Sequence, residues 1–179
     1  MKNICIGLFE GETLPESLAA FKDVKLDLEF GKITTIHTLN QLDCEKIVVV
    51  GLGDGKKNIK EAFSKVEADD YLVYVNENTA YAAGFGLLYG AYSYKEMKVY
   101  DLESDGFKDE FEKGKTVARI VNHARELSDM PSNFLTPDHL VDEAKMVSEK
   151  YGMEIEVLNN DGLEELGAGA LLAVNQGSD

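Results

Sequence analysis

The sequence predicts an α/β protein in which an amino-terminal sheet domain is followed by a long connecting helix and an incomplete start of a second α/β domain. Segments of strand and helix character alternate along residues 1–104, an order typical of a sheet with parallel strands. The chain has 179 residues, 44% of them apolar, which suits one domain or one domain and part of a second. Residues 168–174 are apolar but stand near the end of the sequence, with little chain after them to complete a core.

The amino-terminal domain is expected over residues 1–104. Continuous apolar runs such as 46–50 are typical of strands buried on both faces of a sheet. Residues 24–30 alternate apolar and charged side chains, the pattern of a half-buried strand, and residues 33–37 are its expected partner across a turn. Asn58 is a suitable N-cap for the helix that follows it. The expected strands cover 3–9, 24–30, 33–37, 46–53, 71–75 and 97–100, and the expected helices cover 14–21, 59–66 and 79–94.

The helix expected over residues 79–94 is apolar almost all round, which is typical of a buried helix. It contains Gly84, Gly86 and Gly90, each of which lowers helix propensity by ~1 kcal/mol. We interpret these glycines as sites where the helix packs closely onto the sheet.

Residues 105–130 are expected to connect the two domains. The polar segment 101–107 predicts a hinge. A long helix is expected from Lys108 to Asp129, ending before Pro131 because the residue before a proline disfavours helical backbone. The apolar stripe of this helix is expected to be Val117, Ile120, Val121, Ala124 and Leu127.

The second domain is expected to begin within residues 131–179. Thr136-Pro137-Asp138 combines a hydroxyl N-cap, a proline at the first helical position and an acid in the first turn. Gly152 supplies the stop of that helix. A strand is expected over 153–157, where apolar residues alternate with glutamates, and a short helical turn over 162–166.

Charge and composition exclude several function classes. The chain has 33 acidic and 18 basic residues, a net charge of −15, which argues against a nucleic-acid partner because phosphates reward a basic face. No segment approaches the ~18 apolar residues of a membrane span, and the apolar run at the start is too short for a signal peptide. A cytoplasmic protein without a membrane partner is expected. Cys5 and Cys44 have no disulfide or zinc spacing.

One glycine-rich loop is a candidate ligand site. Residues 51–55, Gly-Leu-Gly-Asp-Gly, follow a buried strand and precede a helix, the position of a phosphate-binding loop. The third glycine comes one residue too early for the dinucleotide pattern G-x-G-x-x-G. Lys56 and Lys57 could attract an anion. We interpret the loop as a tight turn, and whether Gly51–Lys57 binds any ligand stays open.

The sequence gives only weak support for metal ligands or catalytic nucleophiles. His139 and Glu143 are spaced i,i+4 on the expected helix, as are Asp138 and Asp142, so one face could bind a metal weakly. The interpretation as a capped surface helix is preferred, because acids in the first turn suit the helix dipole. No catalytic, cofactor-binding or metal-binding residue is predicted in these 179 residues. Residues without ligand or nucleophile context are His37, His123, Ser128, Asp129 and Ser132.

Two segments of the chain resemble the leucyl (cytosol) aminopeptidase family. Residues 124–137, Ala-Arg-Glu-Leu-Ser-Asp-Met-Pro-Ser-Asn-Phe-Leu-Thr-Pro, are similar to the AR-L-N-P-N-LTP segment that opens the family's catalytic domain. Residues 154–178 resemble its continuation, where the family usually reads GMGALLAVGQGS and Ala168 and Asn175 depart from it. Residues 48–53 and 86–92 match the family's amino-terminal domain more loosely.

The resemblance implies a macro-domain-like, three-layer amino-terminal domain with helices on both faces. It also implies a hydrolase, a metal-dependent exopeptidase that releases amino-terminal residues, often leucine, from peptides through two divalent metal ions, Zn or Mn. The family's metal-binding segments lie beyond the position matching Asp179. This segment alone is therefore expected to be inactive, to bind no cofactor, and to meet peptide substrate only with the missing catalytic part. A homo-oligomer, the family's hexamer, is expected for the complete protein.

Two alternatives stay open. The first is a stand-alone macro-type binding or interaction module without peptidase activity, in which Gly51–Lys57 would contact ADP-ribose or a phosphate. The second is an interaction domain that controls assembly and exposes the apolar residues of its carboxyl-terminal part. Candidates for that exposed face are Leu171, Leu172 and Val174.

Overall fold

A five-stranded sheet organises the first of two units in the computed structural model, which describes residues 2–94 and 100–176. The units comprise Met1–Asp129 and Met130–Asp179 and are described separately below. The first contains, in order, β1 (Asn3–Leu8), the 3₁₀ helix η1 (Glu16–Phe21), β2 (Ile33–His37), β3 (Lys46–Gly51), α1 (Ile59–Phe63), β4 (Tyr71–Tyr74), α2 (Ala80–Gly90), β5 (Leu102–Ser104) and α3 (Lys108–Asp129).

The strands are ordered β2-β3-β1-β4-β5. β1 runs parallel to both of its neighbours, β3 and β4, and β4 runs parallel to β5. β2 is antiparallel to β3 and lies at one edge. All six residues of the central β1 are buried, because a strand in the middle of a sheet covered on both faces is withdrawn from water along its whole length. The sequence's prediction of parallel, doubly buried strands is confirmed.

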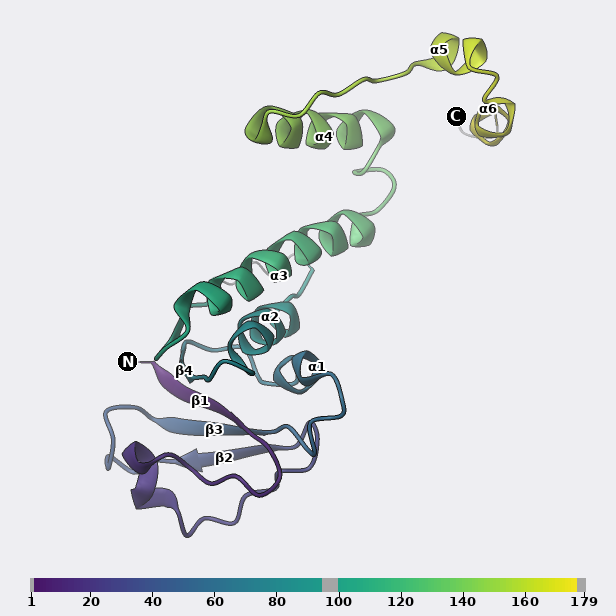
Figure 1. The fold of residues 1–179 in the computed structure, drawn as a ribbon. Helices are drawn as coiled ribbons and strands as arrows, with labels where there is room; N and C mark the ends of the chain where they lie inside the picture. The colour runs from purple at the N-terminus through teal and green to yellow at the C-terminus, as the bar shows by residue number, and fades with distance from the viewer. Residues whose placement is uncertain (1, 95–99, 177–179) are drawn as a thin grey trace. The chain divides into compact units, whose positions relative to one another are not determined.

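The two faces of the sheet carry separate apolar cores. Side chains alternate across the pleat, so that Val48 and Val50 join one core while Ile47 and Val49 join the other. The first core also takes in residues of α1, α2 and α3, and the second takes in Leu18 of η1 and its neighbours. Figure 1 shows α1 and α2 on one side of the strands. The three-layer α/β class is confirmed, with η1 as the helix on the second face.

The strand predicted over residues 24–30 is wrong. This segment runs without ladder partners, and β2 pairs with β3 instead. The alternation did identify two inward-facing side chains, because Leu26 and Leu28 pack against the second core, whereas Val24 is 38% exposed. The backbone, however, is bound to loops: the Leu28 carbonyl accepts from the Gly53 N–H at 3.0 Å. The alternation of apolar and charged residues therefore indicated burial here and did not indicate that the segment belongs to a sheet.

The polar segment at 101–107 is not a hinge, because it contains β5, which pairs with β4. The predicted strand at 97–100 falls mostly on residues 97–99, outside the described residues, and Tyr100 is not in a strand. β5 is also tied to the following helix. The Lys115 ammonium, on α3, donates to the Leu102 carbonyl at 2.8 Å and pairs with Glu112 at 2.6 Å. A buried lysine with both partners thus holds α3 on the sheet edge.

Glycines in α2 serve helix packing, which corrects the expectation that they contact the sheet. A Cβ at Gly84 would overlap the Phe111 carbonyl oxygen of α3, and one at Gly90 would overlap the Ser64 carbonyl at the end of α1. Gly86 faces α1 as well, where an added Cβ would overlap the Lys60 carbonyl oxygen. Gly114 of α3 approaches the Tyr81 carbonyl of α2 in the same way. The absence of side chains lets three helix backbones approach closely.

The long helix α3 begins and ends where predicted, but its packing face differs from the predicted stripe. Ile120 of that stripe is 62% exposed. The sequence pattern alone could not show that α3 packs on α2. Close approach of these two helices requires a glycine in the contact and tolerates polar residues there. The buried residues of α3 are Phe111, Gly114, Lys115 and Ala118.

The second unit contains α4 (Pro137–Tyr151), α5 (Asn160–Glu165) and α6 (Gly169–Asn175). Its predicted start and stop signals are confirmed: the Thr136 hydroxyl accepts from the His139 N–H, and Gly152 has a left-handed backbone at φ 64°. The strand predicted over 153–157 is wrong, since this segment is extended without a ladder in the described chain. An alternating segment forms a strand only where a neighbouring strand accepts its hydrogen bonds.

Candidate functional site

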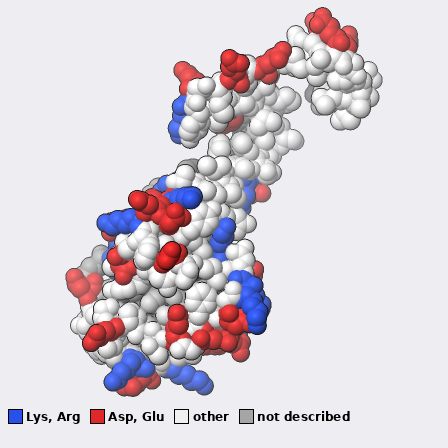
Figure 2. Space-filling view, in the orientation of Figure 1, with Lys and Arg blue, Asp and Glu red and all other residues white. Residues whose placement is uncertain are grey.

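Charged side chains are mixed over the first unit. On the face drawn in Figure 2, Lys and Arg side chains are interspersed with Asp and Glu and form no continuous basic stripe. Several of the bases are paired, as in Lys2 with Asp101 at 2.9 Å and Lys46 with Asp69 at 2.9 Å. Of the described residues, no helix is both long enough and apolar enough to cross a bilayer.

The Gly51–Lys57 loop is a tight turn whose first three amides are engaged. Gly53 and Gly55 have left-handed backbones, at φ 65° and 79°, which is why glycine is needed there. The N–H of Gly51 donates to the Lys32 carbonyl at 2.8 Å, that of Leu52 to Leu8 at 2.8 Å, and that of Gly53 to Leu28 at 3.0 Å. A phosphate-binding loop presents such amides to its ligand. Here they fasten the loop to its neighbours.

The charges of this loop are also satisfied internally. Asp54 pairs with the Lys56 ammonium at 2.7 Å and accepts from the Lys56 N–H at 3.1 Å. These two hydrogen bonds lower the pKa of Asp54, so its carboxylate stays charged and would repel an anion. Lys57 lies over the Phe30 ring, 5.0 Å from its centroid. The geometry supports the interpretation as a turn.

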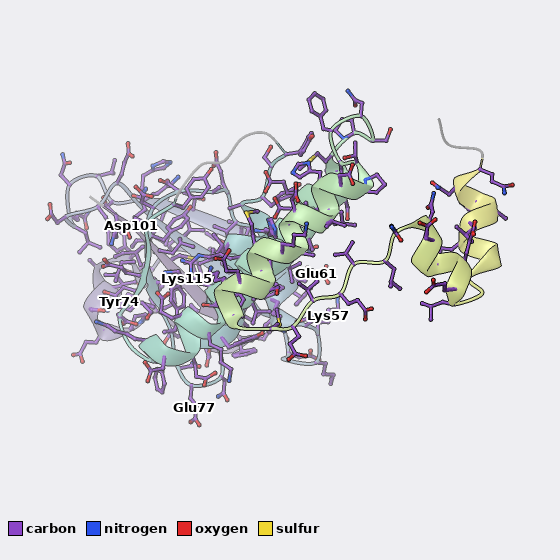
Figure 3. All side chains as sticks on the ribbon, turned by 90° about the horizontal axis from the view of Figure 1, so that it is seen from above. Lys57, Glu61, Tyr74, Glu77, Asp101 and Lys115 are labelled. Carbon is purple, nitrogen blue, oxygen red and sulfur yellow. The ribbon has the colours of Figure 1, made fainter. Side chains whose placement is uncertain are left out.

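A cleft lies at the carboxyl ends of β1 and β4. The connection after β1 leads to η1 on one face of the sheet, and the connection after β4 leads to α2 on the other. In open α/β sheets, adjacent strands whose connections leave on opposite faces create a crevice that commonly holds ligands. Figure 3 marks this region by Tyr74, at the end of β4, and Glu77, in the turn that follows.

We call this crevice the switch-point cleft. It has a volume of about 510 Å³. Its lining is Ile6, Gly7, Leu8, Gly11, Glu12, Thr13, Pro15, Tyr74, Val75, Asn76, Thr79 and Asp105.

Backbone hydrogen bonds fix the acidic residues of the switch-point cleft. The Phe9 N–H donates to Glu12 Oε2 at 2.8 Å, and the Val75 N–H donates to Asp105 Oδ1 at 3.1 Å. Asn76 closes the turn into α2, since its Oδ1 accepts from the N–H groups of Asn78 and Thr79 at 3.0 and 3.1 Å. The cleft is therefore built from rigid strand ends and braced turns. Sequence reasoning missed it, because the order of strands in space is not readable from a pattern of residues.

The candidate ligands on α4 lie in the first two turns of a capped helix. His139 Nδ1 lies 2.9 Å from the Phe134 carbonyl, and its Nε2 lies 3.8 Å from Glu143. Asp142 lies 4.0 Å from the Lys145 ammonium. In the described part of the chain, no three His, Cys, Asp or Glu side chains are grouped as a metal ion would require. The described residues therefore do not fit a metal centre.

The other candidates are dispersed. His37 is exposed at the end of β2, and His123 is exposed on α3. The Ser128 hydroxyl donates to the Ala124 carbonyl one turn earlier, at 2.9 Å. Asp129 accepts from the Tyr92 hydroxyl at 2.7 Å. Each of these contacts is structural.

Alkaline pH is expected to destabilise the first unit. Burial raises the pKa of the Cys5 thiol from about 9 to about 12 and also raises the pKa of the Tyr71 hydroxyl. Above pH 9, the unfolded chain releases protons that the folded chain keeps, so the free energy of unfolding falls as pH rises toward 12. Denaturant melts across this range should show the fall, and Cys5→Ala should make it shallower. A flat profile would contradict the buried-thiol geometry.

Polar and aromatic side chains join the last turn of α2 to the end of α3. Asn122 donates to the Leu88 carbonyl at 2.9 Å, and Arg125 donates to the Tyr89 carbonyl at 3.0 Å. These carbonyls belong to the end of a helix, where intrahelical donors are lacking. The Arg125 guanidinium also lies 4.4 Å from the Tyr89 ring and 4.1 Å from the Tyr92 ring. We call Asn122, Arg125, Tyr89, Tyr92 and Asp129 the α2–α3 anchor.

The Tyr92–Asp129 contact completes this anchor. Partial burial and the hydrogen bond to Asp129 raise the pKa of Tyr92 from 10 to about 12, so the hydroxyl stays a donor above the pH at which an ordinary tyrosine ionises. Sequence reasoning did not assign contacts to Asn122 and Arg125. Arg125 follows Asn122 by three residues and Asp129 follows Arg125 by four, and this spacing indicates that the three share one face of a helix.

Comparison with known proteins gives a consistent result. Residues 122–179 match the family model described as the cytosol aminopeptidase family, catalytic domain. A probable cytosol aminopeptidase of Exiguobacterium sibiricum is 35% identical over 173 residues, covering 83% of this chain and 36% of the relative. The chain belongs to the cytosol aminopeptidase family. A probable cytosol aminopeptidase of Aromatoleum aromaticum is 24% identical over 226 residues, covering 98% of this chain and 45% of the relative.

Solved structures show the same fold as this member of the cytosol aminopeptidase family. The bottromycin maturation enzyme BotP in complex with Mn aligns with a TM-score of 0.70 and 18% identity, over 93% of this chain and 40% of BotP. The cytosol aminopeptidase from Coxiella burnetii aligns with a TM-score of 0.65 and 16% identity, over 92% of this chain and 39% of that one. The chain thus spans less than half the length of these proteins.

The match to the cytosol aminopeptidase catalytic domain begins inside the first unit. Its first residue, Asn122, lies on α3 and belongs to the α2–α3 anchor. Arg125, the second anchor residue on α3, lies within the matched segment as well. In this family member, the start of the catalytic-domain sequence is therefore packed on the sheet unit through named side-chain contacts.

Proposed function

We propose that this chain is the amino-terminal portion of a leucyl-aminopeptidase-like metallo-exopeptidase that releases amino-terminal residues from peptides. The observation that carries the proposal is the match of residues 122–179 to the catalytic domain of the cytosol aminopeptidase family. The 35% identity to a probable cytosol aminopeptidase supports it. We place the enzyme in the cytoplasm, as the name of these relatives suggests.

The catalytic metal ions, Zn or Mn, are proposed to bind outside this portion. The complex of BotP with Mn supports metal use among structures of this fold. The described residues of this chain group no three metal ligands, and the chain covers 36% and 45% of its curated relatives. We therefore propose that residues 1–179 hold no catalytic metal, bind no peptide substrate by themselves and are inactive alone.

The role proposed for this portion is assembly. The first unit fixes the start of the catalytic-domain sequence through the α2–α3 anchor. In the second unit, Leu171 and Val174 are 64% and 81% exposed, as expected for residues that further catalytic-domain chain covers. A homo-oligomer, the hexamer expected from the family, is proposed for the complete enzyme.

A stand-alone macro-type module is the weaker alternative. It requires the Gly51–Lys57 loop to receive an anionic ligand, yet the amides of Gly51, Leu52 and Gly53 are bonded to neighbouring carbonyls. Asp54 adds a carboxylate to the loop. Family membership and loop geometry both favour the aminopeptidase portion.

The inactivity of residues 1–179 is tested by a hydrolysis assay. The purified chain is incubated with leucyl-p-nitroanilide and either Mn²⁺ or Zn²⁺, and release of the chromophore is followed. We expect no release above a matched sample without protein. Metal-dependent release at a rate typical of an enzyme, on the order of 1 per second or faster, would show that the chain is a complete catalyst.

A further inference from the structure

We propose that the switch-point cleft binds an aliphatic primary ammonium compound. The inference is independent of the proposed peptidase function, because the cleft lies wholly within the first unit and contains no residue of the catalytic-domain match. It rests on the position of the cleft in the fold, on the carboxylates at its rim and on the apolar surface beneath them.

The position favours a small-molecule ligand. The cleft opens where the connections of two adjacent parallel strands, β1 and β4, leave on opposite faces of the sheet. Gly7 in its lining is required by the core on the other side of the strand, since a Cβ there would meet the Phe63 ring at 2.5 Å and the Leu52 side chain at 3.0 Å. A volume of about 510 Å³ is within the range of sites for small ligands.

The charge of the lining selects a cation. Glu12 and Asp105 each use one carboxylate oxygen to accept a backbone N–H, which leaves the other oxygen for a ligand. Neither residue is in an ion pair within the described chain, and the lining contains no Lys, Arg or His. An ammonium group can donate to either carboxylate in a charge-assisted hydrogen bond. A phosphate would meet two negative charges.

The apolar part of the lining selects an aliphatic ligand over a bare ion. Half-buried Pro15, Tyr74 and Val75 supply the exposed apolar surface of the lining, since Ile6 and Leu8 beside them are only 6% and 5% exposed. The lining offers a divalent metal two carboxylates and no His or Cys, so most of the metal's remaining ligands would be water. A hydrocarbon chain ending in an ammonium matches both parts of the cleft, whereas a free amino acid brings a carboxylate that its rim would repel.

Chemical-shift titration of the ¹⁵N-labelled chain provides the test. The probes are leucinamide, its neutral acetylated analogue N-acetyl-leucinamide, Mn²⁺ and ADP-ribose. Glu12→Gln and Asp105→Asn each remove a charge yet keep an oxygen that can accept the N–H of Phe9 or Val75. Asp70→Asn is the matched control, since Asp70 Oδ1 accepts the Asp101 N–H at 2.7 Å at the opposite end of the strands and does not line the cleft.

Leucinamide should shift the amide resonances of Gly7, Asn76 and Asp105 to saturation, and N-acetyl-leucinamide should leave them in place. Each cleft variant should weaken leucinamide binding about fivefold, the scale of a partly exposed charge pair, with Asp70→Asn unchanged. Equal binding of the acetylated analogue would overturn the proposal. So would unchanged affinity in both cleft variants, or preferential binding of Mn²⁺ or ADP-ribose at these resonances.

Discussion

Replacing Gly84 with alanine is expected to lower the free energy of unfolding of the first unit by about 3 kcal/mol. The new Cβ would overlap the Phe111 carbonyl oxygen, which belongs to the backbone of α3 and cannot rotate away. Helix propensity alone predicts the opposite sign, because alanine is favoured over glycine by ~1 kcal/mol. The sign of the change therefore reports whether α2 and α3 pack backbone to backbone. Urea denaturation followed by circular dichroism measures it.

Gly106→Ala is the control for this substitution. A Cβ added at Gly106 would have no neighbouring atom within 4 Å, and this glycine has no left-handed backbone, so the change should be within about 0.5 kcal/mol. If Gly84→Ala were as mild as Gly106→Ala, or stabilising, the close packing of α2 on α3 would be wrong.

Replacing Arg125 with alanine is expected to lower the same free energy by about 2 kcal/mol. The substitution removes the hydrogen bonds from the guanidinium to the Tyr89 carbonyl and to Asn122, both 3.0 Å, together with its contacts to two aromatic rings. Arg125→Lys should recover less than half of the loss, because an ammonium cannot stack flat between rings and reach both acceptors.

Arg119→Ala supplies the matched control on the same helix. Arg119 is exposed on α3, and its loss should change the free energy of unfolding by no more than about 0.5 kcal/mol. Comparable losses at positions 119 and 125 would mean that helix propensity or net charge, and not the α2–α3 anchor, explains the Arg125 result.

Denaturant unfolding at alkaline pH provides a third test of the structure of the first unit. A fall in stability between pH 9 and 12 that Cys5→Ala makes shallower would locate the effect in the core beneath α1 and α2. The glycine and arginine substitutions report instead on the packing of helices on one another, so the three measurements test different parts of the same unit.

Much of the secondary structure could be predicted from local signals. The cap at Asn58, the break before Pro131 and the Thr136-Pro137 start set helix ends through contacts within a few residues. The buried runs of β1 and β3 were equally clear, because a strand covered on both faces needs apolar residues at every position. These signals depend on no distant part of the chain.

What could not be predicted depends on partners distant in sequence. Residues 24–30 and 153–157 alternate as strands do, yet neither joins a ladder, since alternation does not show what the backbone binds. The stripe predicted on α3 failed for a related reason: its packing face is chosen by glycines of α2. The switch-point cleft requires the order β3-β1-β4, which no local pattern encodes.

The family resemblance reached further than the local patterns, because motif similarity carries information about a whole domain. Residues 124–137 pointed to an aminopeptidase catalytic domain, and the family match over 122–179 agrees. The resemblance assigned no role to Arg125, although this residue lies at the start of the similar segment. The structure adds that role by placing the guanidinium against the rings of Tyr89 and Tyr92.

The most direct test of the proposed function is to complete the enzyme. Residues 1–179 are joined, at the aligned position, to the remaining sequence of the Exiguobacterium sibiricum relative, and hydrolysis of leucyl-p-nitroanilide is measured with Mn²⁺ or Zn²⁺. We expect metal-dependent hydrolysis by this chimera and none by residues 1–179 alone. A chimera that melts cooperatively and binds metal but hydrolyses no leucyl substrate would contradict the proposal, as would hydrolysis by residues 1–179 alone.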